Sequence, residues 1–357
     1  TIPYGEISGE GEWLLDVYYR LRNAEGLLPS GHCVAKAQIA LTAPAPVALE
    51  MASEKNPNAT VAKPEIIDSH KWYITVQGPD FNIRFNRENG FMNRYEVKGM
   101  EFIKEEGALT PNFWRAPTDN DYGAGLQNKY AAWKNPEMKL KSLKSEMRGD
   151  VAVVEANYEM PGVKAELALA YEINGEGVVK VTESMKADKN AKVSEMFRFG
   201  MQMQMPAAFS DIQYYGRGPI ENYSDRNHST FLGVYNQKVA DQFYPYVRPQ
   251  ETGTKTDIRY WKQLNVAGNG LEFTAAQPFS ASALDYSIES LDGGPNKGAT
   301  HSPEIAKAGY TNLLIDKVQM GLACENSWGA MPLEKYRIPY GDYTFTFMMR
   351  PVFHQLH

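Results

Sequence analysis

Three short runs of this sequence combine aromatic rings with charged and amide side chains at close spacing. They cover residues 113–123 (FWRAPTDNDYG), 215–226 (YGRGPIENYSDR) and 325–329 (ENSWG). Such runs are too polar for the interior of a sheet, where each buried polar group needs a partner. We therefore expect three ordered loops whose polar groups bind one another or a ligand.

The third run is suited to contact with a sugar ring. Trp328 stands between Ser327 and Gly329, so its ring is uncrowded. An indole offers an apolar face to the C–H groups of a pyranose and an N–H donor to a hydroxyl. The alternative is an ordinary core tryptophan, but small polar neighbours favour a platform on a turn. We expect its loop, with Asn326, to lie near residues 115–123, because two polar loops of one domain are most simply explained by one surface site.

The first run is rich in side-chain oxygens. Its candidates for contact with a ligand are Asp119, Asn120, Asp121 and Gly123. The cluster could contact sugar hydroxyls or bind calcium, although it lacks the glycine and the distal glutamate of a calcium loop. The alternative is that these side chains cap backbone amides in an ordered turn. Because Gly123 and Gly125 permit unusual dihedral angles, we expect residues 123–128 to form a mobile loop.

The second run is the most highly charged of the three. It contains Arg217, Glu221, Asn222, Asp225 and Arg226. These side chains could bind a sugar. The sequence favours the alternative, an internal network of salt bridges and hydrogen bonds that fixes a long loop.

Composition excludes several kinds of partner. The chain has 357 residues and a net charge of −6, which argues against nucleic acid. No run approaches the ~20 apolar residues of a membrane helix. Cys33 and Cys324 are the two cysteines, and the six histidines lack metal-ligand spacing. We therefore expect no metal site, no nucleic-acid partner and no membrane partner.

Alternating apolar and polar residues predict long β-strands along most of the chain. The clearest lie at 13–21, 33–41, 72–76, 81–85, 91–97, 163–173 and 197–205. Helix signals are few, the main one being a short helix at 126–134. The pattern predicts an all-β fold of large antiparallel sheets packed face to face as a sandwich, and it excludes a TIM barrel or a doubly wound sheet.

A polar, proline-rich segment at 43–69 is expected to separate two domains. The strands before it are too few for a complete immunoglobulin-like sandwich. We expect residues 1–58 to form part of such a domain with its linker, truncated at the N-terminus. Residues 65–357 should form the large sandwich.

The three runs together resemble the C-terminal region of the β-galactosidases of glycoside hydrolase family 2. That region has an R-A-P-x-D-N-D-x-G segment, a G-x-G-P-x-E-N-Y-x-D-R segment and an S-W pair before a final G-x-Y strand. The corresponding residues here are 115–123, 216–226, 327–328 and 341–343. The resemblance extends over nearly the whole chain and implies a galactose-mutarotase-like supersandwich preceded by the end of an immunoglobulin-like domain.

The resemblance also implies a non-catalytic part of a retaining β-galactosidase. Retaining hydrolysis needs two carboxyl groups about 5–5.5 Å apart. In the family, the catalytic glutamates and most magnesium and sodium ligands lie on a TIM barrel that precedes this region. We therefore expect no catalytic residue and no cofactor in this chain.

The expected partners follow from the same resemblance. They are a β-galactoside, the catalytic barrel of the same polypeptide and, in a full enzyme, further copies in a homo-oligomer. The family's matching tryptophan reaches into the catalytic pocket, which implies the same role for Trp328. A cytoplasmic or periplasmic bacterial enzyme is expected.

Two other functions stay open. A free-standing mutarotase-like sugar epimerase needs an acid and a base beside the sugar ring, for which His228 and His301 are the plausible histidines. A carbohydrate-binding module needs no catalytic group, and binding of galactosides by the isolated chain would support it.

Overall fold

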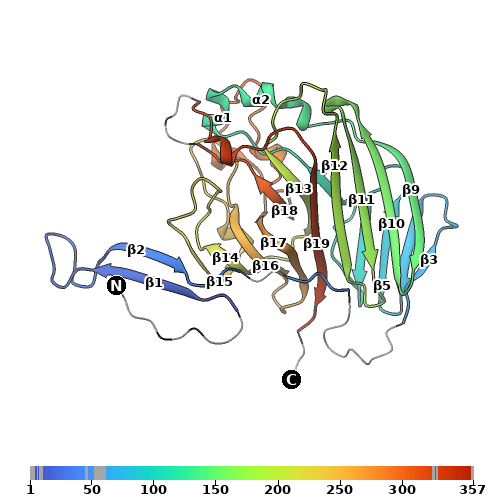
Figure 1. Cartoon of the computed structure of the whole chain (residues 1–357), viewed down its shortest axis with the longest axis horizontal. Helices are drawn as coiled ribbons and strands as arrows, with labels where there is room; N and C mark the ends of the chain where they lie inside the picture. Colours follow the sequence, from blue (N-terminus) through green and yellow to red (C-terminus); the bar gives the residue numbers. More distant parts are fainter. Residues whose placement is uncertain are drawn as a thin grey trace.

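The computed structural model describes residues 5, 7, 11–44, 47–51, 62–323, 326 and 329–354. The first two strands, β1 (Leu14–Arg20) and β2 (Cys33–Ala40), pair antiparallel as a separate two-stranded hairpin. This hairpin projects to one side of a much larger body (Figure 1).

Among the described residues, all other strands join one antiparallel system of hydrogen bonds. Its first half contains β3 (Glu65–Ile67), β4 (Tyr73–Gly78), β5 (Phe81–Asn86), β6 (Met92–Val97), β7 (Met100–Glu101), β8 (Leu109–Asn112), β9 (Lys139–Arg148), β10 (Val151–Met160) and β11 (Ala165–Ile173). Its second half contains β12 (Val179–Ala187), β13 (Arg198–Pro206), β14 (Asp211–Gly218), β15 (Phe231–Lys238), β16 (Lys255–Leu264), β17 (Gly270–Leu284), β18 (Tyr310–Gln319) and β19 (Tyr343–Val352).

These strands form two layers that share β17. One layer runs in the order β3-β4-β5-β6-β8-β13-β18-β17-β16-β14-β15, with β7 paired to β6. The other runs β17-β19-β12-β11-β10-β9. The long strand β17 pairs with β19 through residues 270–275 and with β18 through residues 280–284. One strand therefore belongs to both layers (Figure 1).

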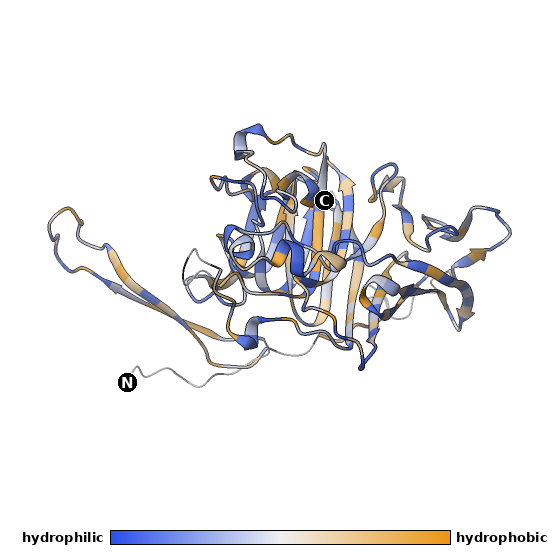
Figure 2. Ribbon diagram, turned by 90° about the horizontal axis from the view of Figure 1, so that it is seen from above, coloured by the Kyte–Doolittle hydropathy of each residue, from blue (hydrophilic) through white to orange (hydrophobic). Residues whose placement is uncertain are grey.

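Side chains from the two layers meet in a common core. The Phe85 and Tyr171 rings, on β5 and β11, lie 4.9 Å apart, and the Tyr95 hydroxyl on β6 donates to the Gly177 carbonyl at 2.7 Å. The methionine-rich strand β13 contributes fully buried side chains, including Met201 and Met205. In Figure 2 the strands of the body alternate between hydrophobic and hydrophilic residues. The predicted large antiparallel sandwich is confirmed.

Helices are short and lie between strands. They are α1 (Asp119–Gly123), α2 (Leu126–Lys129), η1 (Ala131–Trp133), η2 (Pro161–Val163), η3 (Val239–Asp241), α3 (Ile288–Leu291), η4 (Ser302–Glu304) and η5 (Glu334–Tyr336). The helix expected at 126–134 is confirmed as α2 and η1. The prediction of a mobile loop at 123–128 is wrong, because α1 and α2 occupy most of this segment and leave only residues 124–125 between them. No helix in the described part of the chain is long and apolar enough to cross a membrane.

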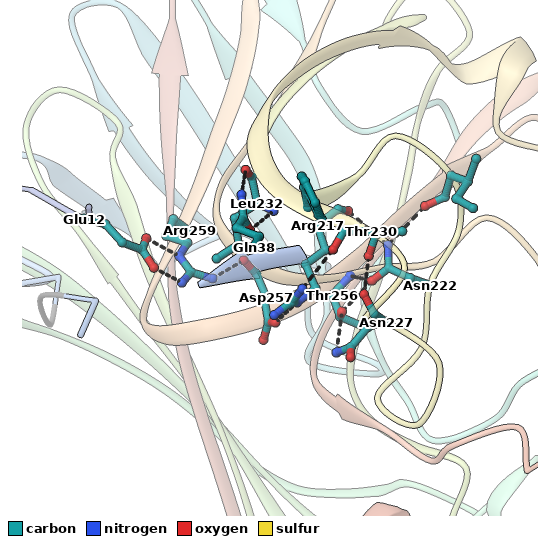
Figure 3. Close-up of polar contacts among 12 residues, drawn as sticks. Glu12, Gln38, Arg217, Asn222, Asn227, Thr230, Leu232, Thr256, Asp257 and Arg259 are labelled. Atoms are coloured by element: carbon teal, nitrogen blue, oxygen red, sulfur yellow. Dashed lines mark hydrogen bonds and ion pairs between the residues drawn. The ribbon is translucent and has the colours of Figure 1, made fainter. Parts of the chain in front are cut away.

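The hairpin contacts the sandwich at its base, as Figure 3 shows. The Arg259 guanidinium of β16 donates to both carboxylate oxygens of Glu12 at 3.0 and 2.5 Å. The Gln38 side chain donates to the Leu232 carbonyl at 3.0 Å and accepts from the Leu232 amide at 2.7 Å. The hairpin is therefore docked by specific contacts, and its assignment to an immunoglobulin-like domain stays a prediction.

Candidate functional site

The first run is anchored by a buried ion pair. Thr118 caps α1, and its amide and hydroxyl form a capping box with Asp121. The Arg115 guanidinium donates to both Asp121 oxygens at 3.0 and 2.8 Å, and both side chains are almost fully buried. The alternative prediction, that these side chains cap backbone amides, is therefore confirmed for Asp121.

Arg115 also joins the first run to the segment that leads into the third. Its guanidinium donates to the carbonyls of Met320 at 2.6 Å and Gly321 at 3.2 Å. It lies over the Phe197 ring, 4.7 Å from the centroid. One buried cation thus fixes two segments that are far apart in the sequence.

Asn120 holds both ends of the third loop. Its Nδ2 donates to the Leu322 carbonyl at 3.3 Å and to the Ala330 carbonyl at 2.8 Å. Gly329 approaches α1 so closely that an added Cβ would lie 2.2 Å from the carbonyl carbon of Gly123. Glycine is needed at 329, since its φ is +87° and no side chain fits there.

The second run reaches the same place through Asp225. Its carboxylate accepts hydrogen bonds from the Leu322 amide at 3.1 Å and the Ala323 amide at 2.7 Å. The three runs therefore meet, in the described residues, at 320–323 and 329–330, a place we call the three-run junction. The expected proximity of the first and third loops is confirmed for their described residues. Trp328 lies outside the described residues.

The other candidates of the first run differ in exposure. Gly123 is exposed, as is Asn326. Asp119 is half exposed and pairs with Arg248 at 3.1 Å and Lys297 at 3.0 Å. Partial burial alone would raise the pKa of Asp119, but Lys297 and Arg248 outweigh it and hold that pKa below its usual value. Asp119 is thus an anion at the edge of the junction.

Other polar side chains of the second run also form their hydrogen bonds and ion pairs within the protein. Asn222 donates to the carbonyls of Arg217 and Ile220 and accepts from the amide and hydroxyl of Thr256. Arg217 pairs with Asp257. The network shown in part in Figure 3 fixes this loop, as the favoured interpretation expected.

Two carboxyl groups stand out in the core. Burial raises the pKa of Glu183 well above its usual value, with Asp316 raising it further, and both side chains are at most 1% exposed. A glycoside cannot reach a pair enclosed between two layers. Within the described residues, no three His, Cys, Asp or Glu side chains form a possible metal site.

The two candidate histidines for epimerase chemistry, His228 and His301, are both exposed at the surface, whereas the two carboxyl groups described above are buried in the core. The His301 ring lies 3.2 Å from the Val247 carbonyl. Neither forms an ion pair with an acid in the part of the chain that is described.

The fold gives the class of protein first: an all-β, two-layered antiparallel sandwich. Its first and second polar runs bond to the described residues that flank the third run. The family model that matches this chain, over residues 77–349, is described as β-galactosidase small chain. The chain therefore belongs to the β-galactosidase small-chain family, as its three runs predicted.

Similar proteins include β-galactosidases from several bacteria. That of Lactobacillus delbrueckii subsp. bulgaricus is 32% identical over 92% of this chain and 31% of its own length. That of Streptococcus thermophilus is 29% identical over 97% of this chain and 32% of its own length. The chain thus spans about a third of the length of these relatives.

Among solved structures, a galactose mutarotase related enzyme from Lactobacillus acidophilus aligns with a TM-score of 0.43 and 8% identity, over 78% of this chain and 97% of that one. Galactose 1-epimerase from the same species aligns with a TM-score of 0.38 and 8% identity, over 82% and 97% of the two chains.

Proposed function

We propose that this chain is the non-catalytic part of a retaining β-galactosidase, and that its three-run junction completes the edge of the galactoside pocket. The carboxyl groups that act on the glycosidic bond would come from the catalytic part of the same enzyme. The single observation that supports this most is the convergence of the three family runs, in their described residues, on 320–323 and 329–330.

The construction of the junction supports a positioning role. Arg115, Asn120 and Asp225 bond to the backbone on either side of the third loop. Fixing the segments on either side of a binding loop favours binding, because segments that are already held in place lose little entropy when a ligand binds. Trp328 and Asn326 would then contact the sugar or the aglycone.

Gly329→Ala in the full-length enzyme tests this proposal. An added methyl group collides with the Gly123 backbone and must displace the third loop. We expect KM for an aryl β-galactoside to rise by about tenfold, because about 1–2 kcal/mol of ring contact is lost. Gly309→Ala is the matched control, since Gly309 also has a positive φ, +75°, but open space around it.

Trp328→Ala should give a similar loss, and Trp72→Ala, at an exposed tryptophan elsewhere, should not. An unchanged KM in both Gly329→Ala and Trp328→Ala would overturn the proposal. Turnover of the galactoside by this chain alone, abolished by changing an acid within it, would overturn the non-catalytic assignment.

A further inference from the structure

A second site is formed by the outer side of the second run. Residues from β15, η3, the segment after it and the start of β16 line, with the second run, a cavity of about 600 Å³ that is open to solvent. Its lining includes Ile220, Glu221, Arg226, Asp241, Tyr244 and Lys255. The volume falls within the ~300–1,000 Å³ typical of small-molecule sites. Asp225, which bonds to the three-run junction, is not among the lining residues.

One wall of the cavity is aromatic. Tyr244 is 58% exposed, and its ring lies 4.7 Å from that of Tyr246. The Tyr246 hydroxyl donates to Glu221, which fixes that ring in place. The two rings are tilted by 52° to each other, so Tyr246 supports the Tyr244 ring without covering its face. An exposed aromatic ring that is held in this way offers an apolar face at little cost in conformational entropy.

The floor of the cavity is polar and pre-organised. The Lys255 ammonium is almost fully buried and donates to the Gln242 side chain at 2.8 Å and the Gly253 carbonyl at 3.1 Å. Glu221 accepts from Thr252 at 3.0 Å and from the Gly253 amide at 2.8 Å. Burial lowers the pKa of Lys255 to about 8, although Glu221 opposes that change. The Lys255 ammonium therefore remains mostly protonated at neutral pH, and Lys255 is among the residues that line the cavity.

The charges of the cavity balance. Glu221 and Asp241 supply two negative groups, and Arg226 and Lys255 supply two positive ones. Arg226 pairs with Glu221 at 3.1 Å. Among the described residues the Asp241 carboxylate, at the exposed rim, makes no ion pair. A charged ligand gains no net attraction from this set, whereas an uncharged molecule with many hydroxyl groups finds both donors and acceptors.

We propose that this cavity is a second carbohydrate site, which binds an uncharged pyranoside. The C–H face of the ring would lie on Tyr244, with hydroxyl groups donating to Asp241 and accepting from Lys255. The site goes beyond the galactoside pocket proposed above, because none of the residues that hold the third loop line it.

Saturation-transfer NMR on the purified chain tests the second site. The probes are methyl β-galactoside and methyl β-glucoside, with sorbitol as an acyclic polyol that has no ring face. We expect transfer to at least one pyranoside at millimolar concentration and none to sorbitol. Tyr244→Ala should weaken the binding by at least about fivefold, the scale of one lost aromatic contact.

Asp241→Asn provides a second variant, which should weaken binding by removing an acceptor at the rim. Tyr244→Phe should retain binding, because the ring face and not the hydroxyl makes the contact. Tyr19→Ala, at a 65% exposed tyrosine of the hairpin, is the matched control and should bind as the unchanged chain does.

The outcomes separate this site from the three-run junction. Binding lost in Trp328→Ala but kept in Tyr244→Ala would overturn the second site and leave the proposed function standing. An absence of transfer to either pyranoside at tens of millimolar would also overturn it. Binding lost in Tyr244→Ala and kept in Trp328→Ala supports it, with melting temperatures of all variants confirming that each is folded.

Discussion

The hairpin and the sandwich are built from the same kind of strand but differ in how they treat apolar side chains. In the sandwich, apolar residues of alternating strands are enclosed between two layers. In the hairpin, the exposed apolar side chains include Trp13, Tyr18, Tyr19, Leu27, Leu28, Val34 and Ile39. Figure 2 shows the two strands extending away from the body of the molecule.

The difference shows that alternating apolar and polar residues along a strand do not by themselves make a stable folded unit. A two-stranded hairpin is at best marginally stable in water, because it has no second layer to cover its apolar face. The described contacts at its base, through Glu12, Gln38 and Tyr18, attach it to the sandwich. We therefore expect the sandwich to tolerate changes in the hairpin, and to be far less tolerant of changes to its own buried charges.

The largest effect is expected from Arg115→Leu in the sandwich. Asp121 would be left as a buried, unpaired carboxylate, which typically costs about 3–5 kcal/mol of unfolding free energy. Denaturant unfolding measures this loss. Arg148→Leu is the control, because Arg148 also pairs with carboxylates, those of Glu146 and Glu155, but is exposed. The unfolding midpoint of this variant should not change. Equal effects of the two variants would contradict the difference in burial.

The next largest expected effect is a change in the stability of the sandwich with pH. Burial raises the pKa of Asp316 from 3.8 to about 7, against the lowering effect of Arg198. The folded state then binds more protons than the unfolded state between these values, so stability falls as the pH rises from about 4 to 7. The contribution is at most about 4 kcal/mol.

Asp316→Asn tests the pH effect, because the amide keeps the shape and does not ionise. The unfolding midpoint of the unchanged chain should decline from pH 5 to 8, and the variant should decline less. A variant with the same decline would show that Asp316 does not titrate in this range.

The smallest effect is expected at the base of the hairpin. Glu12→Gln removes the carboxylate charge but keeps an amide oxygen that can accept from Arg259, so we expect a loss of only about 1 kcal/mol, the scale of one hydrogen bond. Partial burial would raise the pKa of Glu12, but Arg259 and Tyr215 hold it below its usual value. The docking contact should therefore be present at neutral pH and lost as the solution is acidified through that lowered pKa.

Hydrogen exchange measures this docking directly. Amides of β1 and β2 should exchange faster in Glu12→Gln, while those of β13 should not change. Glu25→Gln, at an exposed acid of the hairpin loop, is the control. Faster exchange throughout the sandwich would mean that the two regions unfold together.

Local patterns predicted the strands well. Residues 197–205 alternate strictly, and β13 occupies Arg198–Pro206. The described residues of the first and third runs lie together as predicted, held by the bonds of Asn120 and the close approach of Gly329 to Gly123. The division at 43–69 and the sugar contacts of Trp328 remain predictions.

Hydrogen bonds between residues far apart in the chain could not be predicted from the sequence. Asp225 bonds to amides about a hundred residues further along the chain, and no local pattern specifies such a partner. Lys255 begins a strand with three consecutive polar residues, and a lysine in such a run is usually exposed. It is buried because the second run and Gln242 fold over it.

The strand β17 has a consequence for the order of assembly during synthesis. The first half of β17 is joined to β12 only through β19. The strand β19 follows every other described strand along the chain. Until then the edge of β12 stays unpaired, although β9–β12 were made much earlier. An unpaired edge invites pairing with another chain. We therefore expect a ribosome-bound chain arrested before β19 to recruit chaperones, and one released after β19 to dissociate from them.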